Sequence, residues 1–421
     1  MRILHLSWEY PPLVYGGLGR HVHALAETQA AAGHDVVVLT QHPGDPSVAL
    51  DETVSGVRVL RVPHDPSSIP MSELLAWVLS LNHAFVRAGM RLGRTWTPDV
   101  LHAHDWVVAH TGAALRQEYG VALVATMHAT EAGRHQGWLP NDLSTAIHTT
   151  EWWLTFEARR VITCSQHMRW EVTRLFELPA DKVDVIPNGI DIGEWTTTDD
   201  DVAAARTELA ADGPMVLFAG RLEWEKGVHT LVEAMPRLRR RFPGLRLVVV
   251  GRGSQLEPLE DLARRLRVSR SVHFAGWRTE AGLRSAAAAA DVVVVPSVYE
   301  PFGLVALEAA ALGTPLVASD TGGLAEIVVN GETGLTFPAL DAPALADAVT
   351  AMLRDEVLAR RVVREAREVL SRDYAWPAIA ATTVTAYERA VREERALLAG
   401  QGTRPELRMA VRDGNLLRDA T

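Results

Sequence analysis

The sequence predicts an α/β protein made of two doubly wound parallel sheets. Short apolar segments alternate with helical segments along most of the 421 residues, which is the pattern of parallel strands joined by crossover helices. A polar stretch after residue 195 interrupts this alternation, and it resumes at residue 214. Because 48% of the residues are hydrophobic, the chain can bury two large cores, and we expect two domains.

Each expected strand is a run of apolar, mostly β-branched residues that ends in a turn. In the first half these runs are 3–7, 35–40, 57–62, 100–104, 123–127, 161–164 and 184–187; in the second they are 215–219, 245–250, 272–275, 292–295 and 316–319. The predicted organisation is a domain at 1–195, a linker at 196–213, a domain at 214–375, a helix at 376–398 and a flexible tail at 399–421. The acidic run 199–201 inside the linker is interpreted as a solvated helix start rather than a metal site.

Charge and cysteine content exclude several classes of protein. A net charge of -10 argues against nucleic acid as the main partner. Cys164 is the only cysteine and lies in an expected strand, so no intramolecular disulfide can form, and we expect a buried thiol and a cytoplasmic location. No apolar run approaches the ~20 residues of a membrane span, which predicts no integral membrane segment.

Two glutamates bracket the most informative motif, Glu-Pro-Phe-Gly-Leu-Val-Ala-Leu-Glu at 300–308. It follows the expected strand 292–295, and residues 302–311 have the composition of a helix. Glu300 is therefore expected at the carboxyl end of a strand, where open α/β sheets bind ligands, and Glu308 roughly 12 Å further along the helix. One carboxylate suits a sugar and the other a ribose. Three NH groups can face phosphates between them, those of Phe302, Gly303 and Leu304.

Taken alone, such a pair is more often a loop acid and a solvent-exposed helix acid. A second motif favours a binding site. The strand 215–219 leads into Gly-Arg-Leu-Glu-Trp-Glu-Lys-Gly at 220–227, which places Arg221 and Lys226 five residues apart. Lys226 is one of only two lysines among 42 basic residues, and its compact ammonium suits a phosphate.

Taken together, these motifs resemble the retaining glycosyltransferases of family 4, and the resemblance covers the chain from Met1 to about Arg395. The segments at 7–12, 16–21, 102–106 and 126–131 resemble the glycogen-synthase-like branch of that family, particularly actinobacterial α-1,4-glucosyltransferases of glycogen or methylglucose lipopolysaccharide. The resemblance implies a GT-B fold, in which two Rossmann-like domains face a cleft. Domain 1–195 would then serve the acceptor, domain 214–375 would bind the nucleotide sugar, and helix 376–398 would cross back to the first domain.

By the same resemblance, the chain transfers glucose from UDP-glucose or ADP-glucose to an α-1,4-glucan, retaining the anomeric configuration, without a metal or other cofactor. The implied catalytic residues are His128, Arg221, Lys226 and Glu300. The implied donor-binding residues are Gly16, Gly17, Phe302, Gly303, Leu304 and Glu308. The implied acceptor-binding residues are Asp105, Trp106 and Glu131, with Arg134 and His135 as an extension.

The first glycine-rich turn, at 15–19, precedes a helix expected near Arg20 and can bring bare NH groups to a phosphate. It does not match G-x-G-x-x-G, which disfavours a nicotinamide dehydrogenase. Val14 stands where bacterial glycogen synthases carry the lysine of K-x-G-G-L, so a strict ADP-glucose preference does not follow. His102, His104 and Asp105 have some metal-ligand character, but no third ligand is fixed, and we favour acceptor binding or structural support.

Three alternatives stay open. A mannosyltransferase that uses GDP-mannose and a lipid acceptor would retain nearly every donor motif. A sugar-nucleotide 2-epimerase of the same fold has no use for the segment at 102–106. A non-catalytic nucleotide-sugar-binding protein would not need Lys226 together with both glutamates.

Overall fold

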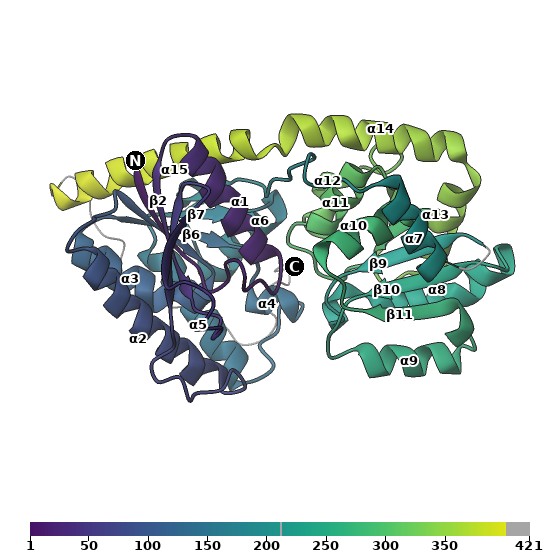
Figure 1. Cartoon of the computed structure of the whole chain (residues 1–421), viewed down its shortest axis with the longest axis horizontal. Helices are drawn as coiled ribbons and strands as arrows, with labels where there is room; N and C mark the ends of the chain where they lie inside the picture. The colour runs from purple at the N-terminus through teal and green to yellow at the C-terminus, as the bar shows by residue number, and fades with distance from the viewer. Residues whose placement is uncertain (211–212, 401–421) are drawn as a thin grey trace. The chain divides into compact units, whose positions relative to one another are not determined.

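The computed structural model describes residues 1–210 and 213–400. The chain folds into two compact units, one made of Met1–Gly189 with the chain from Trp376 onward and the other of Ile190–Ala375. Each unit is an open, doubly wound α/β sheet (Figure 1). The predicted fold class, two mainly parallel sheets of Rossmann type, is confirmed.

The first unit contains an eight-stranded sheet in the order β3-β4-β2-β1-β5-β6-β7-β8, in which only the β3–β4 pair is antiparallel. The strands are β1 (Arg2–Leu6), β2 (Asp35–Gln41), β3 (Asp51–Val54), β4 (Val57–Val62), β5 (Val100–His104), β6 (Ala122–Met127), β7 (Arg160–Thr163) and β8 (Val183–Val185). The helices are α1 (Gly17–Ala31), α2 (Leu74–Leu92), α3 (Ala109–Tyr119), α4 (Glu131–Arg134), α5 (Asp142–Glu157), α6 (Gln166–Phe176) and α15 (Trp376–Leu398).

Helices cover both faces of this sheet, as the two-sided apolar strands require. On one face α1 packs against α15, and on the other α2 packs against α3 (Figure 1). The core beneath α1 and α15 combines Val22 and Leu25 of α1 with Ile379 and Tyr387 of α15. Helix α15 is thus part of the first unit although it follows the second in sequence.

The second unit contains a six-stranded parallel sheet in the order β11-β10-β9-β12-β13-β14. The strands are β9 (Met215–Ala219), β10 (Arg246–Val250), β11 (Val272–Gly276), β12 (Val292–Val295), β13 (Leu316–Ser319) and β14 (Leu335–Phe337). The helices are α7 (Asp199–Leu209), α8 (Val228–Arg241), α9 (Leu256–Arg265), α10 (Glu280–Ala289), α11 (Leu304–Leu312), α12 (Leu324–Ile327), α13 (Ala342–Arg354) and α14 (Glu356–Asp373).

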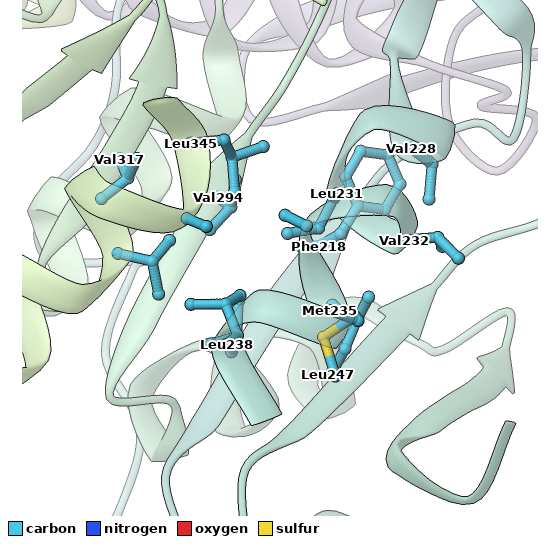
Figure 2. Close-up of a cluster of buried hydrophobic side chains, with 14 of the residues drawn as sticks. Phe218, Val228, Leu231, Val232, Met235, Leu238, Leu247, Val294, Val317 and Leu345 are labelled. Carbon is cyan, nitrogen blue, oxygen red and sulfur yellow. The ribbon is translucent and has the colours of Figure 1, made fainter. Parts of the chain in front are cut away.

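The core of the second unit lies between this sheet and α8. Figure 2 shows Leu231 and Met235 of α8 beside Phe218 of β9 and Leu247 of β10, all fully or almost fully buried. Each such side chain contributes about 1.5–3 kcal/mol when it leaves water. Packing on this scale holds rigid the strands from which the functional loops leave.

The expected strands appear within one or two residues of their predicted ends, whereas β3 and β14 were not predicted. Part of the predicted linker 196–213 is helix α7, which packs against α10. Thr198 caps this helix by accepting a hydrogen bond from the NH group of Asp201, so the acidic run is a helix start, as interpreted from the sequence. Of the predicted tail, residues 401–421 lie outside the described residues.

Each sheet has one topological switch point, where the chain winds away in opposite directions from two neighbouring strands. In the first sheet it lies between β1 and β5, and in the second between β9 and β12. Open α/β sheets bind ligands at the carboxyl ends of such strand pairs. The loops after these four strands, together with the first residues of the helices that follow, carry ten of the thirteen predicted site residues. Of the others, His128 and Glu131 follow β6, and Glu308 lies further along α11.

Candidate active site

The switch point of the second sheet brings Lys226 to Glu300. Lys226 lies in the loop after β9 and Glu300 in the loop after β12, and the Lys226 ammonium donates to Glu300 Oε2 over 2.8 Å. The hydroxyl of Ser297 donates to the same oxygen over 3.1 Å. An ammonium has three protons and a carboxylate two oxygens, so the pair retains donors and an acceptor for a ligand.

Arg221 lies in the same loop as Lys226, and its guanidinium donates to Glu225 over 2.9 Å. The Arg221 side chain is 54% exposed, whereas that of Glu225 is 14% exposed. The carbonyl group of Glu225 accepts hydrogen bonds from the NH groups of Val298 and Tyr299. Glu225 therefore ties the Arg221 loop to the Glu300 loop, a role that sequence reasoning missed because no spacing signal marked this glutamate.

Gly227 explains how the two loops approach so closely. Its φ angle is +66°, and a Cβ atom there would lie 1.9 Å from the carbonyl oxygen of Pro296. Only glycine fits both conditions. The Lys226-Gly227 dipeptide therefore places the Lys226 ammonium beside the point where the two loops meet.

A third loop, after β13, supports Glu300 from behind. The NH group of Gly323 donates to the carbonyl oxygen of Glu300 over 2.8 Å, and a Cβ atom on Gly322 would lie 2.2 Å from that same oxygen. Gly322 and Gly323 form a Gly-Gly turn at this point. In the structure its contact is with the backbone of Glu300.

Helix α11 begins at Leu304, two residues later than predicted, with Gly303 at φ +113° as its N-cap. The first NH groups of any helix lack intrahelical acceptors, so this end of α11 suits an anion. Phe302 is buried and its ring lies 6.0 Å from that of Tyr374. Glu308 lies on α11 and is also largely buried. The structure therefore assembles Arg221, Lys226, Glu300 and the start of α11 within one unit.

In the first unit, the loop after β1 differs from its predicted form. Helix α1 begins at Gly17 rather than near Arg20, so Gly17 is its first residue and Gly16 its N-cap. Glu9 Oε2 accepts hydrogen bonds from the NH groups of Tyr15 and Gly16, over 2.8 and 3.0 Å. Burial raises the pKa of Glu9 although these NH groups oppose the shift. The Gly16 NH group, predicted to face the donor, thus has an internal carboxylate partner.

His128 follows β6 and is held from two sides. Its backbone NH group donates to Asp105 Oδ1 over 2.7 Å, and its ring Nε2 lies 3.2 Å from Nδ1 of His104. Burial lowers the pKa of His128, although the charge of Asp105 acts in the opposite direction. A neutral imidazole at this edge can exchange hydrogen bonds with a hydroxyl group.

The three predicted acceptor residues have mainly internal surroundings. Asp105 and Trp106 are both only 8% exposed, and Asp105 holds His128. Glu131 accepts hydrogen bonds from Ser144 Oγ over 2.8 Å and from His135 Nε2 over 3.2 Å. These side chains fix the loops around His128 more than they present surface to solvent.

Comparison with known proteins gives consistent relatives for both halves of the chain. Residues 15–194 match the family described as Glycosyltransferase Family 4, and residues 199–369 match Glycosyl transferases group 1. The chain is 48% identical over 406 residues to a glycogen synthase of Mycobacterium tuberculosis, covering 94% of this chain and 96% of the relative. It is 31% identical over 412 residues to an alpha-maltose-1-phosphate synthase of Mycolicibacterium smegmatis, covering 92% and 99%.

Among solved structures, a sucrose-phosphate synthase from Thermosynechococcus elongatus superposes with a TM-score of 0.79 at 30% identity. The match covers 95% of this chain and 99% of the other. The two doubly wound units with polar groups at their switch points define a GT-B enzyme that transfers hexosyl groups. The chain belongs to the glycosyltransferases of family 4 and group 1. Within residues 1–210 and 213–400, no helix is long and apolar enough to cross a membrane.

Proposed function

We propose that the protein transfers glucose from UDP-glucose or ADP-glucose to an α-1,4-glucan or a related polysaccharide, with retention at the anomeric carbon. The observation that carries this proposal is the Lys226–Glu300 pair at the switch point of the second sheet. It places a cation and a carboxylate side by side, as a diphosphate joined to a polyhydroxylated sugar requires. The 48% identity to a glycogen synthase supports the choice of glucose and of a glucan acceptor.

In this proposal the positive groups stabilise the leaving diphosphate. Lys226 and Arg221 contribute charge, and the first NH groups of α11 and of Gly17 contribute partial charge. Such preorganised donors act as charge develops, so the proposed transfer needs no metal and no organic cofactor. The diphosphate oxygen that departs is the base that accepts the proton of the incoming hydroxyl.

Glu300 binds hydroxyl groups of the donor sugar. Its Oε1 can accept their hydrogen bonds, because the contacts from Lys226 and Ser297 both go to Oε2. Glu308 binds the ribose, and the backbone around Phe302, Gly303 and Leu304 binds the phosphates. In the first unit, His128 contacts the transferred sugar. Asp105, Trp106 and Glu131 serve the acceptor through the loops that they hold.

The test combines three donors with three acceptors in the presence of a chelator. UDP-glucose, ADP-glucose and GDP-mannose are each incubated with short α-1,4-glucans, with α-glucose 1-phosphate and with a polyprenyl phosphate, and products are followed by mass spectrometry. Elongation of glucans from a glucose donor, with products that an α-specific exoglucosidase removes, supports the proposal. Transfer only to α-glucose 1-phosphate would keep the donor and replace the acceptor. Transfer only from GDP-mannose would overturn both.

A further inference from the structure

A cluster of buried histidines lies under the carboxyl edge of the first sheet, and the proposed reaction uses only His128 of these. His5 of β1 and His102 of β5 are paired in register on neighbouring strands. His104 lies two residues further along β5, on the same face of the sheet. Its ring centroid is 4.1 Å from that of His102 and 5.4 Å from that of His5. The rings continue through His104 to His128.

Gln29 of α1 determines which ring nitrogen of His5 carries the proton. Its Nε2 donates to the hydroxyl of Tyr387 over 3.3 Å, which turns its Oε1 toward His5. This Oε1 lies 2.8 Å from His5 Nε2. An amide oxygen only accepts, so the proton of His5 is on Nε2 and its Nδ1 carries a lone pair.

The protonated nitrogen of His5 in turn determines the donor and acceptor nitrogens of His104 and His128. His5 Nδ1 lies 3.1 Å from His104 Nε2, so His104 Nε2 is the donor and His104 Nδ1 has the lone pair. His104 Nδ1 in turn lies 3.2 Å from His128 Nε2, which must then carry the proton of His128. Each step uses the rule that a neutral imidazole has one donor and one acceptor nitrogen.

The rule applies because the rings are neutral. Burial lowers the pKa of His5 to about 4 and holds the pKa values of His102 and His104 well below their ordinary range. The pKa of His128 is also lowered, chiefly by burial. A second proton on any ring would place two donors face to face.

We propose that Gln29 is a positioning residue that fixes, through His5 and His104, the tautomer of His128, so that His128 presents an unprotonated Nδ1 as a hydrogen-bond acceptor. This inference rests on the proposed function for the identity of the ligand. A lone pair at Nδ1 attracts the hydroxyl proton of a sugar and repels a phosphate oxygen. His128 is therefore matched to a sugar hydroxyl and not to the diphosphate.

The competing use of the cluster is a metal site, since ring nitrogens of His21, His104 and His128 lie within 4.8 Å of one another. A metal ion bound between His104 Nδ1 and His128 Nε2 would need lone pairs on both atoms, whereas the proposed hydrogen bond needs a proton between them. The two uses exclude each other, and one experiment separates them.

The experiment is imidazole nitrogen NMR on the full chain labelled with ¹⁵N-histidine, with the His128 signals assigned by their loss in His128→Gln. The expected result is His128 with a protonated Nε2 and an unprotonated Nδ1 in protein without ligand. Protonation at Nδ1 would overturn the proposal. So would stoichiometric zinc in the purified protein, if its removal shifted the His104 and His128 signals.

Gln29→Leu tests the origin of the tautomer. Without the amide oxygen, the His128 nitrogen signals should move to values averaged over the two tautomers. Turnover should fall roughly five- to tenfold, the effect of one misdirected hydrogen bond. The matched control is Thr28→Val on the same helix, because the Thr28 hydroxyl donates to the Ala24 carbonyl within α1 and to no histidine that an observed contact names. Its His128 signals should stay as in the wild type. An unchanged tautomer in Gln29→Leu would overturn the role of Gln29.

The wild-type spectrum decides the tautomer even if Gln29→Leu does not fold. It also needs no substrate, so failure of the glucosyl-transfer assay and failure of this inference are distinct results.

Discussion

The ammonium of Lys226 lies 2.8 Å from Glu300 Oε2, although 74 residues separate the two. The loops that carry them leave β9 and β12, neighbouring strands from which the chain winds in opposite directions. The Lys226 and Glu300 side chains are 19% and 14% exposed, so they are mostly screened from water but open to a ligand. The pair thus joins the two loops and supplies the charges that the proposed donor needs.

Replacing either member should lower activity strongly. We expect Lys226→Met and Glu300→Gln each to reduce turnover about 10²–10³-fold, because a preorganised partner of the transition state is lost. Lys226→Met should also lower the free energy of unfolding, since it leaves Glu300 without its cation. Steady-state kinetics and urea unfolding measure the two effects.

The double variant Lys226→Met with Glu300→Gln separates stability from function. It should recover stability relative to Lys226→Met, because no unpaired charge remains, while turnover stays low. Lys182→Met, which removes the only other lysine, is the control for turnover. Recovery of turnover in the double variant would show that the pair is structural only.

The strand ends and glycine-rich turns that carry the candidate site are local signals, so the sequence alone can predict where they lie. Lys226 and Glu300 each follow such a strand end. Their contact depends on β9 lying beside β12, which is a consequence of strand order. Periodicity along the chain does not encode this order.

The features that sequence reasoning missed are polar or depend on tertiary contacts. Strand β3 is the polar segment Asp51–Val54, joined to β4 through Ser55-Gly56 with positive φ angles, a hairpin signal that could have been used. Glu9 and Gln29 gave no signal of this kind, because their partners come from a loop fold and from the packing of α1 against the sheet.

Gly227 should tolerate no side chain. Gly227→Ala combines strain at φ +66° with a Cβ atom 1.9 Å from the Pro296 carbonyl oxygen. We expect a loss of stability on the order of 4 kcal/mol, together with weaker donor binding. Gly276→Ala is a matched control, because its φ is +67° but nothing lies within 4 Å of the added Cβ. It should cost only about 1–2 kcal/mol. Equal losses in the two urea unfolding curves would contradict the crowding argument.

Acid should destabilise the first unit through its buried histidines. Five of them have lowered pKa values, chiefly through burial: His5, His21, His102, His104 and His128. Their unfolded pKa is 6.5, so below that pH the unfolded chain binds more protons than the folded chain. Stability should therefore fall as the pH decreases from about 6.5 toward 4, by up to ~1.4 kcal/mol per pH unit for each histidine.

Two buried carboxyl groups oppose this trend. Burial raises the pKa values of Glu9 and Glu151, so these groups take up protons in the folded state first and add stability as the pH falls. With five histidines against two glutamates, the net change should still be a loss. Urea unfolding between pH 7.5 and 5 measures it, and His5→Gln should reduce the slope whereas exposed His83→Gln should not. A free energy of unfolding that is constant over this range would contradict the conclusion that these histidines are neutral in the folded protein.

The last prediction concerns how α15 is held in the first unit. Glu394 of α15 is 7% exposed and accepts hydrogen bonds from Arg116 and Arg159, each over 2.8 Å. Burial acts to raise the pKa of Glu394, but the two guanidinium groups outweigh it and hold that pKa below its ordinary value. Glu394→Gln removes the charge that both arginines share. We expect it to lower the free energy of unfolding of the first unit by about 3 kcal/mol.

Its neighbour provides the control, because Glu393 is 43% exposed and pairs with Arg160, which keeps a second carboxylate partner in Asp184. Glu393→Gln should therefore cost less than about 1 kcal/mol. Thermal melting of both variants, with tryptophan fluorescence to follow the units, measures the difference. If Glu394→Gln melted like Glu393→Gln, the packing of α15 against α1 would anchor the helix without help from this ionic network.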